Sequence, residues 1–361
     1  MKYQQLYKYI HEESQMGKAE NLKSRLQTIF ESLQFFAANK GDTSIKVRCS
    51  ELKSICDSIL SVAQLLEENR RIEAHTKLYN ICFAEGSNLS LKIYTLKKDA
   101  ALYRMRSANT FAKYTKDGAE EMYHIPFELR YKVGNARFNI PGFPLFYLAS
   151  SVYGCWEEMK RTDLDFANVA LFKPTKDLIF LDLTLPNSNK TIDASTILTL
   201  PLILASRMKV ERPEENYIPE YSIPQLIMEC LIAMRNKDAN PESNIIGIRY
   251  GSIHQDERDL LFDETYKDDI FVNYAIPPFE VSERGICPKI KQLFEFWNNT
   301  SWAEIKYRNI DISSCNPKTY YEQSVFGVIE HRLNLIVPGM LTYTTKREGG
   351  ISPGALNIKI T

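Results

Sequence analysis

The sequence predicts an α+β fold in which a helical N-terminal segment precedes a mixed region of short strands and helices. Over about the first 85 residues, apolar side chains recur at three- and four-residue steps, which is the periodicity of amphipathic helices. From about Leu89 onward, short β-prone runs are broken by Pro, Gly and Asn turns and separated by helical stretches. These strands do not alternate regularly with helices, so neither a Rossmann nor a TIM-barrel pattern is predicted.

Three helices are predicted in the N-terminal segment. The first carries an apolar stripe of Leu22, Leu26, Ile29, Phe30, Leu33 and Phe36. The second repeats the pattern with Leu52, Ile55, Ile59, Val62, Leu65 and Leu66, after the turn sequence Asn-Lys-Gly-Asp at 39–42. The third is expected from about Arg70 to Glu85, where Gly86 suits a helix end. We interpret the segment as a small helical bundle used for packing or for binding a partner.

The rest of the chain divides into a mixed region and a tail. The β-prone runs are SLKIYTL, LFYLASS, DLIFLDLTL, NIIGIRYGS and DIFVNYAI, with a helical stretch at Gln225–Arg235. In the tail, FEFWNN is interpreted as a helix end and VFGVIEHRLNLIVP as strand-like. The length of 361 residues suits two or three domains. We predict a helical domain over 1–88, a mixed α+β domain over 89–283, and a C-terminal extension packed on the core over 284–361.

Charge and cysteine content restrict the class of protein. The 45 basic and 45 acidic side chains give zero net charge, which argues against a nucleic-acid-binding surface. Seven cysteines without a CxxC pair favour free thiols over a disulfide framework or structural zinc. The N-terminus lacks the apolar core of a signal peptide, and the run TILTLPLILASRMKV is too short for a membrane span. We therefore predict a cytoplasmic protein without a metal site or a membrane partner.

Common catalytic motifs are absent. The sequence has no Walker A motif, no G-x-G-x-x-G after a strand and no H-E-x-x-H, and its five histidines are scattered. The informative stretch is residues 122–159, where Arg137 begins the turn R-F-N-I-P-G-F-P. An apolar strand follows, and then a predicted helix that carries Glu158. Arg104 in L-Y-R lies upstream and Ser252 in I-G-I-R-Y-G-S lies downstream, each at a strand-like run.

This ordered set resembles the RES domain, a family named for its arginine, glutamate and serine. The family pattern begins with L-Y-R, matched at Arg104, and ends with G-x-x-Y-x-S, matched at Gly247, Tyr250 and Ser252. Between them the family has a glutamate 21 residues after its arginine, a spacing that selects Glu158 over Glu157. The central element is matched by Arg137, Phe138, Asn139, Pro141, Gly142, Pro144, Tyr147, Leu148, Ala149 and Ser151. The resemblance covers about residues 97–280, with insertions expected around 159–220.

The resemblance implies both a fold and an activity. RES domains resemble ADP-ribosyltransferases, so the core is expected to be an ADP-ribosyltransferase-like mixed sheet. Family members are toxins of bacterial toxin–antitoxin pairs that degrade NAD+ at the nicotinamide–ribose bond, by hydrolysis or phosphorolysis. Compact members pair with a helix-turn-helix antitoxin that blocks the active site. The expected substrate is therefore NAD+, no further cofactor is required, and a cognate antitoxin protein is an expected partner.

The same resemblance assigns roles to six residues. Glu158, Arg104 and Ser252 are the expected catalytic residues, with the Glu158 carboxylate stabilising an oxocarbenium-like transition state or holding the ribose hydroxyls. Arg137 is the expected substrate-binding arginine and, with Arg104, would hold the pyrophosphate, since guanidinium groups bind phosphate in a bidentate manner. Ser252 would donate a hydrogen bond to ribose or phosphate. Tyr250 and Phe138 are expected to contact the substrate, one of them stacking on nicotinamide.

Two other functions stay open from the sequence. An ADP-ribosyltransferase that modifies a macromolecule would use the same site, with an acceptor in place of water. A non-catalytic RES-like module would use the helical segment to recruit a partner. If that segment is only an interaction domain, a chain without residues 1–86 should fold and keep its activity. The acceptor, the antitoxin and a homo-oligomeric state are not determined by the sequence.

Overall fold

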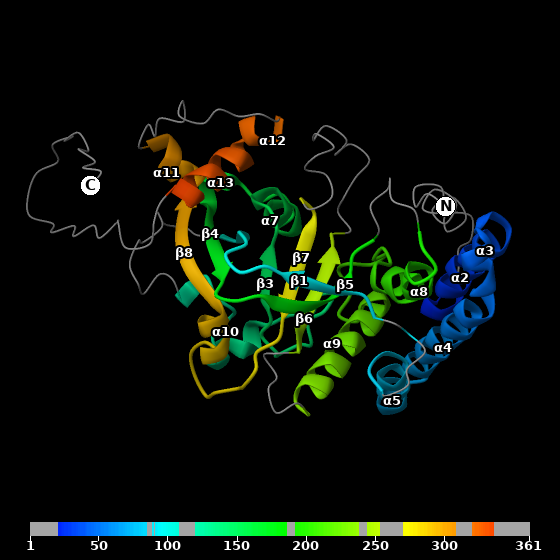
Figure 1. The fold of residues 1–361 in the computed structure, drawn as a ribbon. Helices are drawn as coiled ribbons and strands as arrows, with labels where there is room; N and C mark the ends of the chain where they lie inside the picture. The colour runs from blue at the N-terminus through cyan, green and yellow to red at the C-terminus, as the bar shows by residue number, and fades with distance from the viewer. Residues whose placement is uncertain are drawn as a thin grey trace, which may run out of the picture.

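The structure is a computed structural model, and its core is an eight-stranded mixed sheet with helices packed on both faces (Figure 1). This confirms the predicted α+β fold. The residues that it describes are 21–84, 89, 91–107, 120–185, 192–237, 244–252, 270–307 and 320–335. The predicted boundary at Gly86-Ser87-Asn88 lies outside them.

The N-terminal helices form where the apolar stripes predict them. They are α2 (Leu22–Lys40), α4 (Cys49–Glu67) and α5 (Arg71–Cys82), together with the short α3 (Thr43–Val47). Asn21 caps α2 by accepting a hydrogen bond from the Ser24 amide at 2.9 Å, and Asp42 caps α3 through the Ile45 amide at 3.1 Å. The apolar stripes of α2 and α4 are buried, so tertiary packing supplies most of the stability of these helices.

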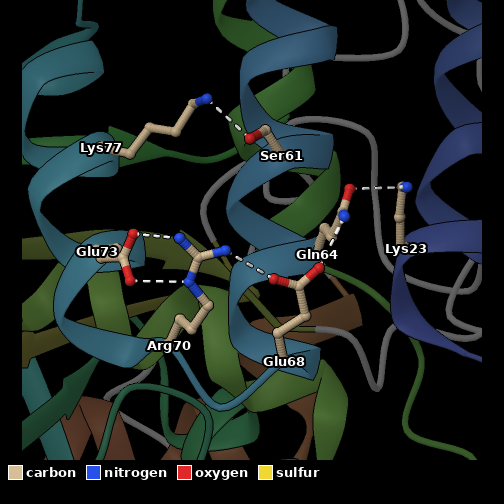
Figure 2. Close-up of polar contacts among 7 residues, drawn as sticks. All are labelled: Lys23, Ser61, Gln64, Glu68, Arg70, Glu73 and Lys77. Carbon is tan, nitrogen blue, oxygen red and sulfur yellow. Dashed lines mark hydrogen bonds and ion pairs between the residues drawn. The ribbon is translucent and has the colours of Figure 1, made fainter.

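Polar contacts tie these helices together at the surface. Figure 2 shows Arg70, just before α5, between Glu68 and Glu73, with Nη1 at 3.0 Å from Glu68 Oε2 and Nε at 2.8 Å from Glu73 Oε1. Lys77 of α5 donates to the Ser61 hydroxyl of α4 at 2.7 Å, and Lys23 of α2 donates to Gln64 of α4 at 3.1 Å. Exposed pairs of this kind contribute little to stability.

The sheet contains the five predicted runs and three further strands. In spatial order the strands are β1 (Ile93–Leu96), β5 (Leu178–Leu183), β6 (Ile245–Gly251), β7 (Val272–Ile276), β3 (Phe146–Ala149), β2 (Leu102–Ser107), β4 (Ala167–Pro174) and β8 (Phe294–Ser301). Among the strands that the structure describes, only β5 and β6 pair in parallel. Their crossover contains α8 (Thr196–Ser206), the 3₁₀ turn η3 (Pro219–Tyr221) and α9 (Ser222–Arg235).

Two places in the sheet depart from regular pairing. The register of β5 and β6 shifts beside Gly247, where a Cβ atom would lie 2.5 Å from the Ala275 carbonyl oxygen of β7. Glycine therefore allows the close approach of β6 and β7. Between β2 and β3 the register contains a single pair, Tyr103 with Ala149. The sheet is thus weakly joined at the junction of β2 and β3.

One apolar core connects the sheet to the N-terminal helices. Helix α4 packs on α8, and α5 packs on α9, so α8 and α9 lie between the sheet and α2–α5 (Figure 1). The buried residues of this core run from Leu26 of α2 through Ile203 of α8 and Leu226 of α9 to Ile248 of β6. The N-terminal helices and the crossover helices therefore share a continuous interior.

The remaining helices cover the other parts of the sheet. On the same face as α8, α7 (Val152–Glu158) and α13 (Val325–Leu335) enclose a second core over β2 and β4. On the opposite face, η1 (Phe127–Lys132) and α10 (Pro288–Leu293) enclose a third. The other short elements are η2 (Leu164–Phe166), α11 (Trp302–Tyr307) and α12 (Tyr320–Gln323).

Two expectations for the tail are wrong. The FEFWNN sequence lies in strand β8 rather than at a helix end, because Phe296 and its neighbours pair with β4, where Phe296 lies opposite Phe172. The VFGVIEHRLNL sequence forms helix α13 rather than a strand. Its β-branched residues suggested a strand, but Val328, Ile329 and Leu333 are buried together, at the spacing of one helical face.

The described residues also bear on cysteine chemistry and on membrane insertion. The six cysteines within the described ranges are free thiols. Burial raises the pKa of the Cys56 and Cys230 thiols, each to about 12. Among the helices that the structure describes, none combines the length and the apolar character needed to span a bilayer.

Candidate active site

Three central strands present polar side chains on one face of the sheet. Asn273 of β7 lies directly opposite Ala149 of β3 and Tyr250 of β6, so the side chains of these residues share a face. Tyr147 lies two residues before Ala149 on β3 and therefore points to the same side. This face forms a platform of Tyr147, Asn273 and Tyr250.

Helix α7 places Glu158 over the platform. Its N-cap is Ser151, whose hydroxyl accepts from the Gly154 amide at 2.8 Å and donates to the Ile270 carbonyl at 2.5 Å. Glu158 is the last residue of the helix and is exposed, and its Oε1 accepts a hydrogen bond of 2.7 Å from Asn273 Nδ2. The neighbouring Glu157 is buried and pairs with Arg161. Glu158, rather than Glu157, is therefore the carboxylate held on the platform.

Arg137 lies at a second side of the site. The turn after it needs Gly142, whose φ of +80° is disfavoured for residues with a Cβ atom. The buried Arg137 guanidinium donates from Nη1 to the Ser206 carbonyl at 2.8 Å and from Nη2 to the Met208 carbonyl at 3.2 Å. It also lies 5.3 Å from the centre of the Tyr221 ring. Arg137 is thus held by the chain that follows α8.

Charge interactions connect Arg137 to the platform. Burial lowers the pKa of Arg137, whereas Tyr221, Tyr250 and Glu158 act in the opposite direction. Burial also raises the pKa of Tyr250, and the Glu158 carboxylate raises it further. Arg137, Tyr250 and Glu158 are therefore close enough to interact, and the structure brings these three predicted residues together.

Tyr147 is a candidate site residue that sequence reasoning missed. A tyrosine in an apolar strand is typical of a core residue. Its hydroxyl is buried near the Phe138 backbone and donates its hydrogen to no acceptor among the described residues, although buried hydroxyls usually donate one. Burial and then Glu158 raise the pKa of this phenol, so the hydroxyl stays protonated beside the carboxylate. The signal that could have revealed it is its tyrosine hydroxyl, for which an apolar strand offers no partner.

Phe138 and Ser252 are more enclosed than the predicted roles suggest. Phe138 has 0% exposure and packs against Tyr250, with ring centres 4.7 Å apart, so it supports Tyr250 from within the core. Ser252 follows β6 directly and is also buried. Its amide donates to the Phe271 carbonyl at 2.7 Å, and its carbonyl accepts from Arg207 Nη2 at 3.1 Å. Arg207 therefore fixes the end of β6 at which Ser252 lies.

Arg104 lies at the junction of β2 and β3. Strand alternation places it on the opposite face from Tyr103, and its guanidinium carbon is 5.6 Å from the centre of the Phe146 ring. Nη1 donates to the Tyr147 carbonyl at 2.7 Å, while Nε is buried without a partner among the described residues. Burial, and then the nearby Arg106, lower the pKa of Arg104 to about 9. In this conformation Arg104 binds the β3 backbone.

The arrangement suits a ligand with both anionic and electron-poor parts. An exposed carboxylate can stabilise developing positive charge, and a buried guanidinium can bind phosphate oxygens. The Tyr147 hydroxyl, which donates to no acceptor among the described residues, can donate a hydrogen bond to a ligand at the same place. Within the described ranges, no three His, Cys, Asp or Glu side chains gather closely enough to hold a metal ion.

Comparison with known families identifies the domain that contains this site. Residues 102–276 match the family model of the RES domain. Residues 102–276 are a RES domain. The chain is also 30% identical, over 241 residues, to the protein named "Putative toxin YopC" from Bacillus subtilis (strain 168). That alignment covers 61% of this chain and 51% of the relative, so the chain spans about half of the relative's length. No solved structure matches the chain.

The match divides the structure into a RES domain and two flanking parts. All six predicted site residues and Tyr147 lie inside the RES domain. Helices α2–α5 precede it, and α10–α13 with strand β8 follow it. The RES domain therefore contains the candidate site, and both flanking parts pack against it.

Proposed function

We propose that the RES domain of this protein cleaves NAD+ at the bond between nicotinamide and ribose, and that the protein acts as a bacterial toxin or defence effector. The observation that carries the proposal is the exposed Glu158 carboxylate, held by Asn273 beside the buried hydroxyl of Tyr147. The membership of residues 102–276 in the RES family and the toxin name of the relative support the same conclusion.

The proposed reaction balances without a further cofactor. The C–N bond to nicotinamide breaks, and its electron pair neutralises the pyridinium nitrogen. A water oxygen forms the new bond to the ribose carbon and loses a proton to solvent, which gives nicotinamide, ADP-ribose and H+. Phosphate in place of water would give a phosphorylated ADP-ribose. The transition state resembles an oxocarbenium ion, which a nearby carboxylate stabilises.

Each residue of the site receives a role in this proposal. Glu158 stabilises the developing charge on ribose or holds its hydroxyl groups, and the Tyr147 hydroxyl donates a hydrogen bond to the same sugar. Arg137 binds the pyrophosphate. Tyr250 lines the site, and Ser252, at the end of β6, donates to ribose or phosphate. Arg104 would reach the pyrophosphate only by leaving the Tyr147 carbonyl. A cognate antitoxin that covers this site is the proposed protein partner.

The test is nicotinamide release from NAD+ by the full-length protein, measured with and without phosphate. Wild-type protein should release nicotinamide. Glu158→Gln should lower kcat/KM by about 10²–10³-fold, because it removes a charge aimed at the transition state. Unchanged turnover in Glu158→Gln would contradict the assigned role. No turnover by wild type under either condition would contradict NAD+ cleavage itself.

Two further variants act as controls. Glu157→Gln makes the same chemical change one residue away, where the carboxylate faces Arg161, and it should keep most of the activity. Tyr147→Phe removes only the hydroxyl and should lower kcat/KM by about tenfold, the value of one hydrogen bond. Transfer of label from NAD+ to a macromolecule, without free ADP-ribose, would instead identify an ADP-ribosyltransferase.

A further inference from the structure

The chain between α8 and α9 forms the wall that holds Arg137. Its residues from 209 to 217 are mostly exposed, and among them the structure describes no regular helix or strand. Arg137 nevertheless depends on this chain, because its guanidinium donates to the Ser206 and Met208 carbonyls and lies over Tyr221. Contacts that hold this chain in place therefore also affect the position of Arg137.

Arg25 of helix α2 binds this wall at three points. Its Nη1 donates to the Glu220 carboxylate, its Nη2 donates to the Lys209 carbonyl at 2.8 Å, and its Nε lies 3.4 Å from Glu211 Oε1. These contacts reach both ends of the exposed stretch. The guanidinium fork of arginine permits this simultaneous binding, which a lysine ammonium cannot reproduce.

Glu220 connects Arg25 to the candidate site. Its side chain is only 4% exposed, and the next residue in the chain is Tyr221. Glu220 is also among the charges that interact with Arg137. A buried carboxylate is stabilised by a nearby cation, and Arg25 supplies one. With Arg25 removed, Arg137 would become the cation that Glu220 attracts.

We propose that Arg25 is a positioning residue for Arg137: it pins residues 207–221, neutralises Glu220, and so keeps the Arg137 guanidinium available for an anionic group of the substrate. The identity of that group as the pyrophosphate of NAD+ rests on the proposed function. The N-terminal helices are, on this view, part of the site's scaffold.

The chain offers a matched control for Arg25. Arg71 of α5 pairs with Glu229 of α9 at 2.6 Å, so it is also an arginine that joins an N-terminal helix to the crossover. Neither Arg71 nor Glu229 lies in residues 207–221. The Arg71 pair is also more exposed than the Arg25 pair. Loss of this pair should therefore leave Arg137 in place.

The experiment compares full-length Arg25→Ala, Arg25→Lys and Arg71→Ala by amide hydrogen exchange and by NAD+ kinetics. In Arg25→Ala, exchange should rise about tenfold or more within residues 207–221 and stay unchanged in β6 and β7, since only the wall loses its anchor. The KM for NAD+ should rise about tenfold with kcat little changed, because truncating one partner of a buried charge pair frees the other. Arg71→Ala should change neither quantity.

A second substitution separates positioning from simple stability. Adding Glu220→Gln to Arg25→Ala removes the unpaired carboxylate and should return the KM toward the wild-type value, although the wall stays looser. Arg25→Lys should fall between wild type and Arg25→Ala, and it replaces Arg25→Ala if that variant does not fold. A KM that Glu220→Gln does not lower would overturn the charge argument.

The two measurements also separate this inference from the proposed function. If wild-type protein does not turn over NAD+, the proposed function fails, while hydrogen exchange still tests the anchor. Unchanged exchange at residues 207–221 in Arg25→Ala would overturn the inference whatever the substrate is. A uniform rise along the chain, equal in Arg71→Ala, would overturn it as well.

Discussion

The helices on the two sides of the RES domain are attached to it in different ways. Helices α2–α5 share a continuous apolar core with α8 and α9, and they add the buried Arg25–Glu220 pair. Helix α13 also contributes apolar side chains to the core over β2 and β4. Its contacts with the start of α7 and with Tyr103 of β2, however, are polar. Glu330 Oε1 accepts from the Val152 amide at the start of α7 at 2.7 Å, and Asn334 donates to the Tyr103 hydroxyl of β2 at 3.1 Å.

This difference indicates how each flanking part affects the site. An apolar interface is insensitive to pH and fails when a large part of it is removed. A buried carboxylate at a helix N-terminus depends on its own ionisation state. We therefore expect the N-terminal helices to control whether the domain folds, and Glu330 to make the stability of α7 depend on pH.

The largest expected effect is that of deleting residues 1–84. The deletion would expose the buried faces of α8 and α9 that α4 and α5 cover, and large exposed apolar patches cause aggregation. We expect an insoluble product, measured as the soluble yield and by size-exclusion chromatography. A soluble, active product would instead support the interpretation of residues 1–88 as a separable interaction domain.

Two single substitutions on α5 provide the matched test. Leu78 is completely buried, so Leu78→Ala should lower the free energy of unfolding by about 2–5 kcal/mol. Ile72 is 83% exposed on the same helix, so Ile72→Ala should change it by less than about 0.5 kcal/mol. Equal effects of the two would contradict a shared core.

An intermediate effect is expected from Glu330→Gln. Burial raises the pKa of Glu330 to about 7, above the ordinary value of 4.5 that applies in the unfolded chain. Between these two values the folded protein binds more protons than the unfolded one, so wild-type stability should fall as pH rises through this window. This pKa difference corresponds to about 3 kcal/mol of folding stability. Glutamine cannot ionise, so the variant should lack this pH dependence.

The measurement is urea unfolding of wild type and Glu330→Gln at pH 5 and pH 8. Relative to wild type, the variant should gain stability between the two pH values. The groups that face Glu330 do not titrate in this window, because burial raises the pKa of Tyr321 and of Cys155 far above it. Parallel pH profiles for the two proteins would contradict an ionising Glu330.

The smallest effect is expected from Arg70→Ala. Arg70 makes the most ion pairs in Figure 2, with Glu68 and Glu73, but all three side chains are exposed. Solvent screens such pairs, so the urea midpoint should not change measurably. A clear shift would mean that surface ion pairs, and not the apolar core alone, hold the N-terminal helices together.

The sequence predicted those parts of the fold that depend on local periodicity. The apolar stripes of α2 and α4 predicted the position of each helix to within a few residues. The five-residue α3 is too short to show a hydrophobic period. Helix α13 was misread because Val325, Val328 and Ile329 favour strands in isolation, and only packing against α7 and β4 selects the helix. Long, strongly patterned segments were therefore predictable, and short or ambiguous ones were not.

The site was predictable where motif spacing determines it. The spacing from Arg137 to Glu158 selected the carboxylate that the structure holds on Asn273. Asn273 itself was not singled out, because its place opposite Tyr250 follows from strand register, which the sequence does not specify. That the Tyr147 hydroxyl has no acceptor among the described residues is likewise visible only after folding.

The single residue pair between β2 and β3 has a consequence for the order in which the protein matures. Helix α13 spans this junction, since Asn334 binds Tyr103 of β2 and Glu330 binds the start of α7, which follows β3. A ribosome synthesises a chain from its N-terminus, so these contacts form only after translation has passed residue 334. Until then a nascent chain can contain every residue of the candidate site without the helix that joins its two halves.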